Sequence, residues 1–179
     1  MPVEPIVPVL ILSGTVGVGK TTVLNEVHDV LSGARVPHAC IDRDAYALSW
    51  PARGAFNQHA VLQNVAAVWA NFSAAGAERL VIAGVVEQAE DLKDYRRAVP
   101  GARLTVCQLA AAEATRCARL QAREAGESLE WHLRRTVELQ QIFDETPLYD
   151  FTVTNEDGPV RPVALEILTL AGWPTRQVT

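Results

Sequence analysis

Residues 7–21 read VPVLILSGTVGVGKT, and this segment sets the arrangement of the rest of the chain. Residues 7–12 form a continuous apolar run, whose shortness and following glycine favour a fully buried strand. From Lys20 to Leu31 apolar residues recur at helical spacing, and Gly33 stands where a helix C-terminal cap is expected. The segment therefore predicts a strand, a glycine-rich loop and a helix, in that order.

The loop itself, GTVGVGKT at residues 14–21, matches the phosphate-binding pattern G-x-x-x-x-G-K-[ST]. Glycines let the backbone curl until several N–H groups converge on phosphate oxygens, and the helix N-terminus adds positive potential. We expect Lys20 to reach the β and γ phosphates of ATP and Thr21 to hold Mg²⁺ through its hydroxyl. The residues predicted to contact the nucleotide here are Gly14, Thr15, Val16, Gly17, Val18, Gly19, Lys20, Thr21 and Thr22.

Predicted strands and helices alternate along the remaining sequence. Short apolar runs predict strands at residues 38–41, 80–86, 104–109 and 151–153. Helical periodicity predicts helices between Asn57 and Gly76 and at residues 91–99, 110–125, 129–144 and 160–171. This alternation predicts an α/β fold with a five-stranded parallel sheet covered by helices on both faces. No repeat or linker interrupts it, so we expect one domain over residues 1–179.

Composition narrows the classes of partner and compartment. The 179 residues carry a formal net charge of −5, which disfavours a nucleic-acid partner. No apolar run approaches the roughly 18 residues of a membrane span, so no membrane partner is expected. The cysteines, Cys40, Cys107 and Cys117, have no C-x-x-C spacing, which argues against a zinc ribbon or a disulfide framework. A reducing, cytoplasmic location fits these features.

Two large classes of nucleotide-binding protein lack their motifs here. The dinucleotide pattern G-x-G-x-x-G is not satisfied after Gly17 and Gly19, which excludes a Rossmann oxidoreductase. Neither D-x-x-G nor N-K-x-D occurs, so a regulatory GTPase is not indicated. The chain instead resembles the nucleoside monophosphate kinase-like group of P-loop kinases, which includes gluconate kinases, adenylylsulfate kinases and chloramphenicol phosphotransferases. The resemblance spans nearly the whole chain in element order.

The resemblance implies roles for acidic residues at the end of the second strand. In that group the acceptor lies over this strand end, where a carboxylate handles the attacking hydroxyl or a magnesium-bound water. Asp42 and Asp44 occupy that position, and we assign Asp44 as the base and Asp42 as its metal-side partner, although the order could be reversed. Glu87 follows the third strand, which lacks the usual aspartate, and would replace it or contact the acceptor. Arg43 and Arg53 are further candidates for the acceptor site.

Arginines in the predicted helices near residues 116–138 resemble the short lid of these kinases. Arg119 takes the adenine-stacking role and Arg123 a phosphate role by this resemblance, with Arg134 or Arg135 contributing across the closed lid. The alternative is a solvated helix face paired with nearby glutamates. Asn155, after the last strand, is expected near adenine. Trp131 lies on an apolar helix face and is predicted to pack in the core.

The expected activity is transfer of the γ-phosphoryl group of ATP, with Mg²⁺, to a hydroxyl of a small molecule. Acceptors that resemble sugar acids, nucleosides or antibiotics all stay open. One alternative is a nucleoside or nucleoside monophosphate kinase, although the D-G-x-P-R string of the latter is missing. A second alternative is a nucleotide-binding regulator that hydrolyses slowly or not at all. A monomer or a homodimer is expected.

Overall fold

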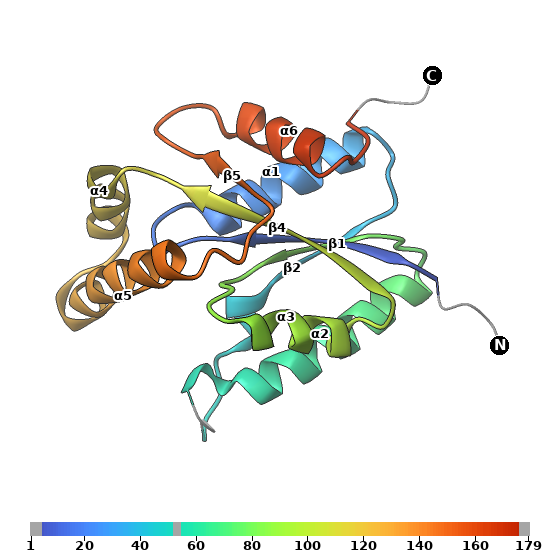
Figure 1. Ribbon diagram of the computed structural model, residues 1–179, viewed down its shortest axis with the longest axis horizontal. Coiled ribbons are helices and arrows are strands. Elements are labelled where there is room, and N and C mark those ends of the chain that lie inside the picture. Colours follow the sequence, from blue (N-terminus) through green and yellow to red (C-terminus); the bar gives the residue numbers. More distant parts are fainter. Residues whose placement is uncertain (1–4, 52–54, 176–179) are drawn as a thin grey trace.

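The computed structural model describes residues 5–51 and 55–175 and contains one parallel sheet. The strand order is β2-β3-β1-β4-β5, and every pairing is parallel (Figure 1). The strands are β1 (Val7–Ser13), β2 (Ala39–Asp42), β3 (Leu80–Ala83), β4 (Ala102–Ala110) and β5 (Phe151–Thr154). The predicted five-stranded parallel sheet is confirmed.

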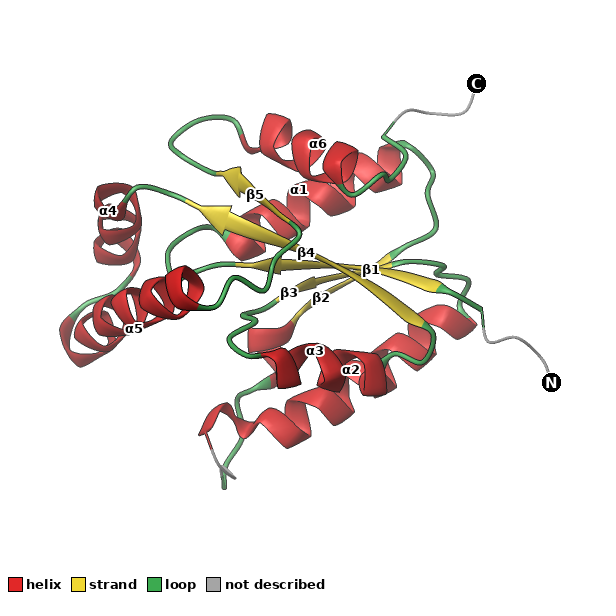
Figure 2. Ribbon diagram, in the orientation of Figure 1, coloured by secondary structure: helices red, strands yellow, loops and turns green. Residues whose placement is uncertain are grey.

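Helices cover both faces of this sheet, as Figure 2 shows. One face carries α1 (Lys20–Gly33) and α6 (Val160–Leu170), and the other carries α2 (Gln58–Ala74) and α3 (Ala89–Ala98). Two further helices, α4 (Glu113–Arg123) and α5 (Gly126–Glu145), lie beyond the carboxyl end of β4. The result is a three-layer α/β architecture in which α4 and α5 stand at the carboxyl edge of the sheet, where ligands bind in such folds.

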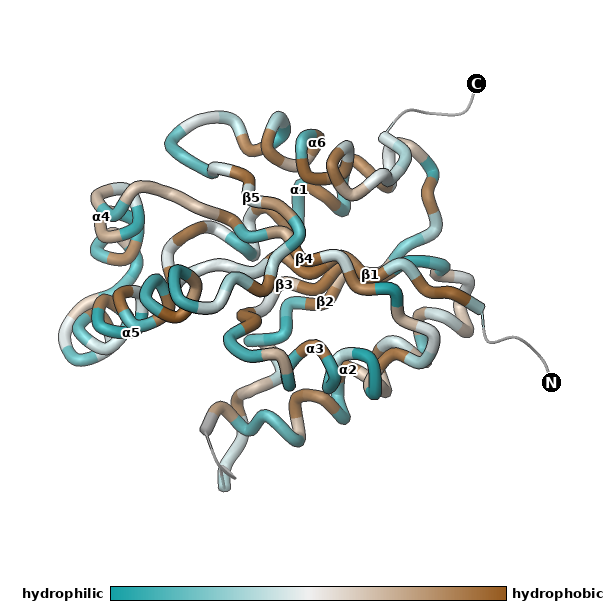
Figure 3. The backbone as a smooth tube through the Cα atoms, in the orientation of Figure 1, coloured by the Kyte–Doolittle hydropathy of each residue, from teal (hydrophilic) through white to brown (hydrophobic). Residues whose placement is uncertain are grey.

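The core consists of two apolar layers, one on each side of the sheet. Successive side chains of a strand point to opposite faces, so Leu10 and Leu12 pack against α1 and α6. Val9 and Ile11 pack against α2 and α3 on the other side. Because both faces are covered, the central strands β1 and β3 are apolar at nearly every position, and Figure 3 shows brown tubes at the centre of the sheet. No helix in the described part of the chain is long and apolar enough to cross a membrane.

The third strand is shorter than the sequence predicted, because it ends at Ala83 and not at Val86. Its neighbour β2 already ends at Asp42, opposite Ala83, so no strand is left to pair with residues 84–86 on that side. Side chains satisfy this backbone instead: Arg43 donates to the carbonyl of Val85, and the Ser13 hydroxyl accepts from the amide of Val86. The apolar run therefore continues as a loop that passes over the carboxyl edge of the sheet.

Helix boundaries near the lid also differ from the prediction. The helix predicted at residues 110–125 spans Glu113–Arg123, since β4 pairs with β5 as far as Ala110. The next helix begins at Gly126, earlier than the predicted residue 129. The turn between the two helices is thus only two residues long.

Candidate active site

The phosphate loop connects β1 to α1 at the carboxyl edge of the sheet. Gly17 and Gly19 have backbone φ angles of 81° and 94°, in the region that side-chain-bearing residues rarely adopt. A Cβ at Gly17 would lie 2.8 Å from the carbonyl oxygen of Arg116, and one at Gly19 would lie 2.6 Å from Nδ2 of Asn155. The glycines therefore serve both the curl of the loop and its close contact with α4 and the segment after β5.

Buried polar side chains fix the shape of this loop from behind. They come from α4, α5 and the segment after β5, and each is less than a tenth exposed. Their bonds run from Arg116 Nη1 to Thr15 Oγ1 (3.1 Å), from Thr136 Oγ1 to the Val16 carbonyl (3.1 Å) and from Asn155 Nδ2 to the Val18 carbonyl (2.8 Å). A loop held by such bonds is preorganised, so little conformational entropy is lost when an anion binds. Asn155, predicted near adenine, is here a support of the loop.

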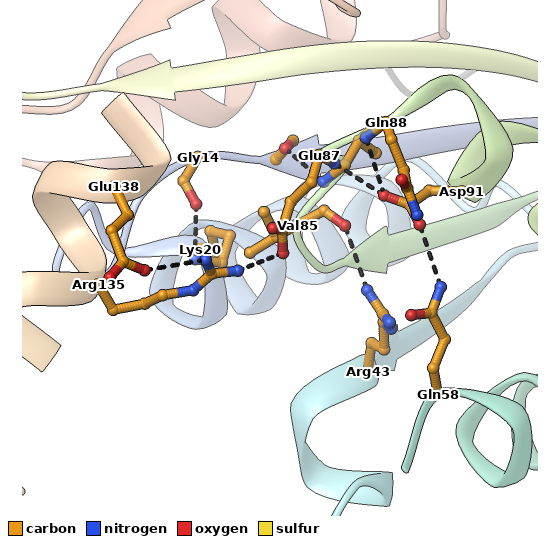
Figure 4. Close-up of polar contacts among 12 residues, drawn as sticks. Gly14, Lys20, Arg43, Gln58, Val85, Glu87, Gln88, Asp91, Arg135 and Glu138 are labelled. Atoms are coloured by element: carbon orange, nitrogen blue, oxygen red, sulfur yellow. Dashed lines mark hydrogen bonds and ion pairs between the residues drawn. The ribbon is translucent and has the colours of Figure 1, made fainter. Parts of the chain in front are cut away.

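Lys20 folds back over the loop. Its Nζ donates hydrogen bonds of 3.0 Å to the carbonyls of Gly14 and Thr15 (Figure 4). Burial lowers the pKa of Lys20 below its ordinary value, while the nearby carboxylates of Asp44 and Asp42 raise it. The two carboxylates thus help to keep the ammonium charged in a partly buried position.

Thr21 and Asp42 form the pair that could hold a metal ion. The Thr21 hydroxyl donates to Asp42 Oδ2 at 2.6 Å, which joins the first turn of α1 to the end of β2. Hydroxyl and carboxylate oxygens are ligands that Mg²⁺ prefers, and the pair stands beside the phosphate loop, so the donor set fits a nucleotide-bound Mg²⁺. The other oxygen, Asp42 Oδ1, accepts from the amide of Asp44 at 3.2 Å and starts the turn Arg43–Tyr46. Asp42 is thereby directed at Thr21, and Asp44 is left exposed.

A cavity of about 980 Å³ extends from the phosphate loop to the first turn of α2. Its volume is near the upper end of the range for small-molecule pockets. Six of the predicted loop residues line one end, together with Arg119 and Arg123: Val16, Gly17, Gly19, Lys20, Thr21 and Thr22. Polar residues line the other end, namely Arg43, Asp44, Gln58, Glu87, Gln88, Asp91, His132 and Arg135. Apolar residues complete it: Ala47, Leu48, Phe56, Val61, Val85, Trp131, Leu139 and Ile142. Thr15 and Val18, also predicted to contact nucleotide, are buried behind the loop.

The two arginines at the acceptor end are already engaged by protein groups. Arg135 forms ion pairs with Glu87 and, at 3.4 Å, with Glu138 (Figure 4). Arg43 donates to the carbonyl of Val85 at 3.2 Å. Glu87, predicted to replace a third-strand aspartate or to contact the acceptor, is thus a partner of Arg135. Among the described residues at this end, Arg135 has its charge offset by Glu87 and Glu138, whereas Arg43 bonds to a neutral carbonyl and keeps its charge.

Asp91 is a site residue that the sequence analysis missed. Its carboxylate is 6% exposed and accepts from the amides of Glu87 and Gln88 at 2.8 and 3.1 Å. It also accepts from Gln58 Nε2 at 3.1 Å, which fixes that amide at the cavity wall (Figure 4). The signal for it was an acidic residue in the first turn of a helix just after an apolar strand, which is a common N-terminal capping arrangement.

Aromatic side chains form the outer wall of the acceptor end. The ring of Trp131 lies 6.1 Å from that of Phe56 and 4.8 Å from that of His132, between centroids. The guanidinium of Arg135 lies 5.4 Å from the centroid of Phe56. Trp131 is 42% exposed and lines the cavity, so its predicted core position is wrong. Its apolar helix face meets the open space over the sheet edge and not the sheet itself.

The predicted lid arginines fall into two groups. Arg119 lines the cavity and donates to the carbonyls of Asn155 (3.0 Å) and Val18 (3.4 Å). Arg123 also lines the cavity, with an exposed side chain paired to Glu124 at 2.6 Å. Both stand at the phosphate end, beside Lys20.

Arg134, another lid candidate, is not among the described residues that line the cavity. Its side chain is 67% exposed and lies 3.9 Å from Glu130. Arg53 lies outside the described residues. Of the later lid arginines, only Arg135 reaches the acceptor end.

Comparisons with known proteins bear on the family and the fold. The family model described as an AAA domain matches residues 10–142. The Deinococcus radiodurans tunicamycin resistance protein is similar in structure, with a TM-score of 0.65, 16% identity and coverage of 95% of this chain and 98% of that one. A Sinorhizobium meliloti gluconokinase (TM-score 0.61, 18% identity, 94% and 92% covered) is also similar. So is the Acinetobacter baumannii shikimate kinase in complex with shikimate (0.57, 19%, 93% and 93%).

At these identities the likeness is one of fold, and the predicted P-loop kinase fold is confirmed. No curated protein sequence matches the chain.

Proposed function

The chain belongs to the AAA domain family, and from that premise we propose that it transfers the γ-phosphoryl group of ATP to a hydroxyl of a small molecule. The observation that carries this proposal is the position of Asp42 and Asp44. One carboxylate is bonded to Thr21 of the phosphate loop, and the other faces the cavity beyond it. A donor site and an acceptor site thus share one cavity, with acidic groups between them.

The donor end has the groups that phosphoryl transfer requires. Lys20 and the loop amides would bind the phosphate oxygens, and Arg123 would add positive charge from α4. Thr21 and Asp42 would hold Mg²⁺, which supplies charge neutralisation at the phosphates. Positive groups converge here although the whole chain is negative, since local placement decides where an anion binds.

Asp44 would act on the acceptor. Its carboxylate lines the cavity next to Lys20, and an Asp44 oxygen would accept the proton of the acceptor's hydroxyl group. At the same time the oxygen of that hydroxyl would bond to the γ-phosphorus, and the bond from the γ-phosphorus to the bridging oxygen would break, so that ADP leaves. Asp42 cannot serve equally well, because Thr21 and the Asp44 amide already occupy its two oxygens. This division supports Asp44 as the base and Asp42 as the metal-side residue.

The acceptor end favours a neutral, partly apolar compound. The charge of Arg135 is offset by its ion pair with Glu87, whereas the exposed carboxylate of Asp44 would repel an anionic substrate. Phe56, Trp131 and their aliphatic neighbours offer apolar area for a ring or chain. An antibiotic-like or nucleoside-like alcohol fits this surface better than a sugar acid or a nucleoside monophosphate. The tunicamycin resistance protein among the similar structures supports the same class.

The experiment is a transfer assay with γ-labelled ATP and Mg²⁺ over a panel of acceptors. The panel contains neutral antibiotics with a free hydroxyl, tunicamycin among them, together with nucleosides, nucleoside monophosphates, gluconate and shikimate. We expect a labelled product with a neutral, partly apolar alcohol. Product only with a monophosphate would select a nucleoside monophosphate kinase, and tight ATP binding without any product would select a nucleotide-binding regulator.

Variants of two aspartates test the mechanism within the same assay. Asp44→Asn should lower kcat far more than it weakens ATP binding, since the carboxylate acts on the acceptor. Asp29→Asn is the matched control, because Asp29 is an exposed carboxylate in the second half of α1. Equal losses of kcat and of ATP affinity in Asp44→Asn would reassign Asp44 to binding.

A further inference from the structure

Two histidines and a cysteine meet between α1 and β2, outside the proposed active site. His28 lies in the second half of α1, His38 just before β2, and Cys40 within β2. One ligand atom from each lies within 4.8 Å of the other two. His28 Nδ1 and His38 Nε2 are 2.9 Å apart, and none of these atoms faces the nucleotide cavity. The fold thus brings together three metal-ligating side chains that phosphoryl transfer does not use.

The contacts of His38 fix which of its nitrogens is available. Its Nδ1 lies 2.7 Å from the carbonyl oxygen of Val36, a contact that only an N–H can make favourably. In the neutral ring Nε2 then carries a lone pair, and it is this atom that faces His28. A backbone carbonyl in this role is the usual outer partner of a metal-binding histidine, because it orients the ring and fixes the tautomer.

His28 can complete the nitrogen pair with a small adjustment, and the Cys40 sulfur lies within 4.8 Å of both histidines. His28 is exposed, so its proton can reside on Nε2 in contact with water while Nδ1 acts as a ligand. Two nitrogens on one tetrahedral zinc ion, each about 2.0–2.1 Å from the metal, lie about 3.3 Å apart. The observed 2.9 Å therefore needs an opening of only a few tenths of an ångström. Cys40, half-buried against α1, would lose its thiol proton to solvent as the metal–sulfur bond forms.

We propose that His28, His38 and Cys40 form a site for a zinc-type divalent cation. Two neutral imidazoles and one thiolate are the borderline-soft ligands that Zn²⁺ selects over Mg²⁺, and they leave a fourth tetrahedral position for water. Cys40 lies two residues before Asp42 on β2, so the bound ion would tie the second half of α1 to the strand that ends at Asp42. The proposal is independent of the phosphotransferase activity.

Cobalt is the probe for this site, because a cobalt–thiolate bond gives an absorption band in the near ultraviolet. The full chain, freed of metal with a chelator and then exchanged into buffer, is titrated with Co²⁺ in excess Mg²⁺, which keeps the Thr21 and Asp42 pair occupied. We expect one Co²⁺ per chain, the thiolate band, and displacement of that band by Zn²⁺. Absence of the band in the wild-type chain overturns the proposal.

Matched variants assign the ligands. Cys40→Ser should remove the band, and His28→Ala should weaken Zn²⁺ binding by more than the roughly 10-fold to 100-fold that loss of an outer partner costs. Cys117→Ser and His59→Ala, at a partly buried cysteine and an exposed histidine elsewhere, should leave band and affinity unchanged. Because His28 is exposed, His28→Ala decides the question even where Cys40→Ser fails to fold. A band that survives in Cys40→Ser or unchanged affinity in His28→Ala contradicts the assignment.

Discussion

Replacement of Gly17 by alanine is the sharpest test of the phosphate loop. The φ angle of 81° at this position costs an alanine about 1–2 kcal/mol. The added Cβ would also lie 2.8 Å from the carbonyl oxygen of Arg116, in the backbone of α4, and 3.2 Å from Leu120. Neither the strain nor the clash can be relieved by a flexible side chain, so the loop itself must shift.

A shifted loop directs its amides less well at the phosphates. Loss of one hydrogen bond to a charged acceptor costs about 1.5–3 kcal/mol. That loss corresponds to roughly 10-fold to 150-fold in the dissociation constant of ATP. Isothermal titration calorimetry with ATP and Mg²⁺ measures the change in affinity, and chemical denaturation measures the accompanying loss in the free energy of unfolding.

Gly33→Ala is the matched control. Gly33 ends α1, has no positive φ, and an added Cβ would meet nothing within 4 Å. We expect unchanged ATP affinity and a gain of about 0.4–1 kcal/mol in the free energy of unfolding, since alanine restricts the unfolded chain. The reasoning is refuted if Gly17→Ala binds ATP as tightly as the wild-type chain, or if Gly33→Ala loses as much affinity.

Three further predictions concern Lys20, Asp42 and Ile11. Burial lowers the pKa of Lys20 from its ordinary value of 10.5, so the free protein loses the Lys20 proton as the pH rises towards that value. The affinity for ATP should therefore decrease with rising pH before pH 10.5 is reached, because the phosphates need the charged ammonium. Calorimetry in buffers of different ionisation heat should then detect proton uptake on binding, and its absence at alkaline pH counts against this role. Asp42→Asn should raise the Mg²⁺ concentration needed for half-maximal activity by more than about tenfold, and an unchanged requirement would remove Asp42 from the metal site. Ile11→Ala should lower the free energy of unfolding by about 2–5 kcal/mol and Ile11→Val by only about 0.5–1.5, because Ile11 is fully buried in β1; equal effects would contradict the packing.

Sequence patterns were sufficient for the architecture because one local signal determined much of it. The loop at residues 14–21 requires a strand before it and a helix after it, and the alternation of later elements then requires a parallel sheet. Element ends were less predictable. The apolar residues Val85 and Val86 satisfy a strand pattern, but their backbone bonds to Arg43 and Ser13, from segments far away in the sequence.

The acceptor end could not be derived in the same way, since its properties depend on pairs that are distant in the chain. Arg135 reads as a free cation in sequence, and only the folded chain pairs it with Glu87, 48 residues away. An apolar helix face predicts a core position for Trp131, but the sequence pattern does not show whether that face packs on the sheet or lines a cavity. Asp91 reads as a helix-capping residue, and its second bond, to Gln58, depends on how α2 and α3 pack.

The most direct test of the central claim is calorimetric titration of the wild-type chain and Lys20→Ala with ATP in the presence of Mg²⁺. The account predicts saturable heat with one ATP bound per wild-type chain, and little or none in Lys20→Ala. No heat in the wild-type chain, or equal binding by the two proteins, would contradict the assignment of residues 14–21 as the triphosphate site.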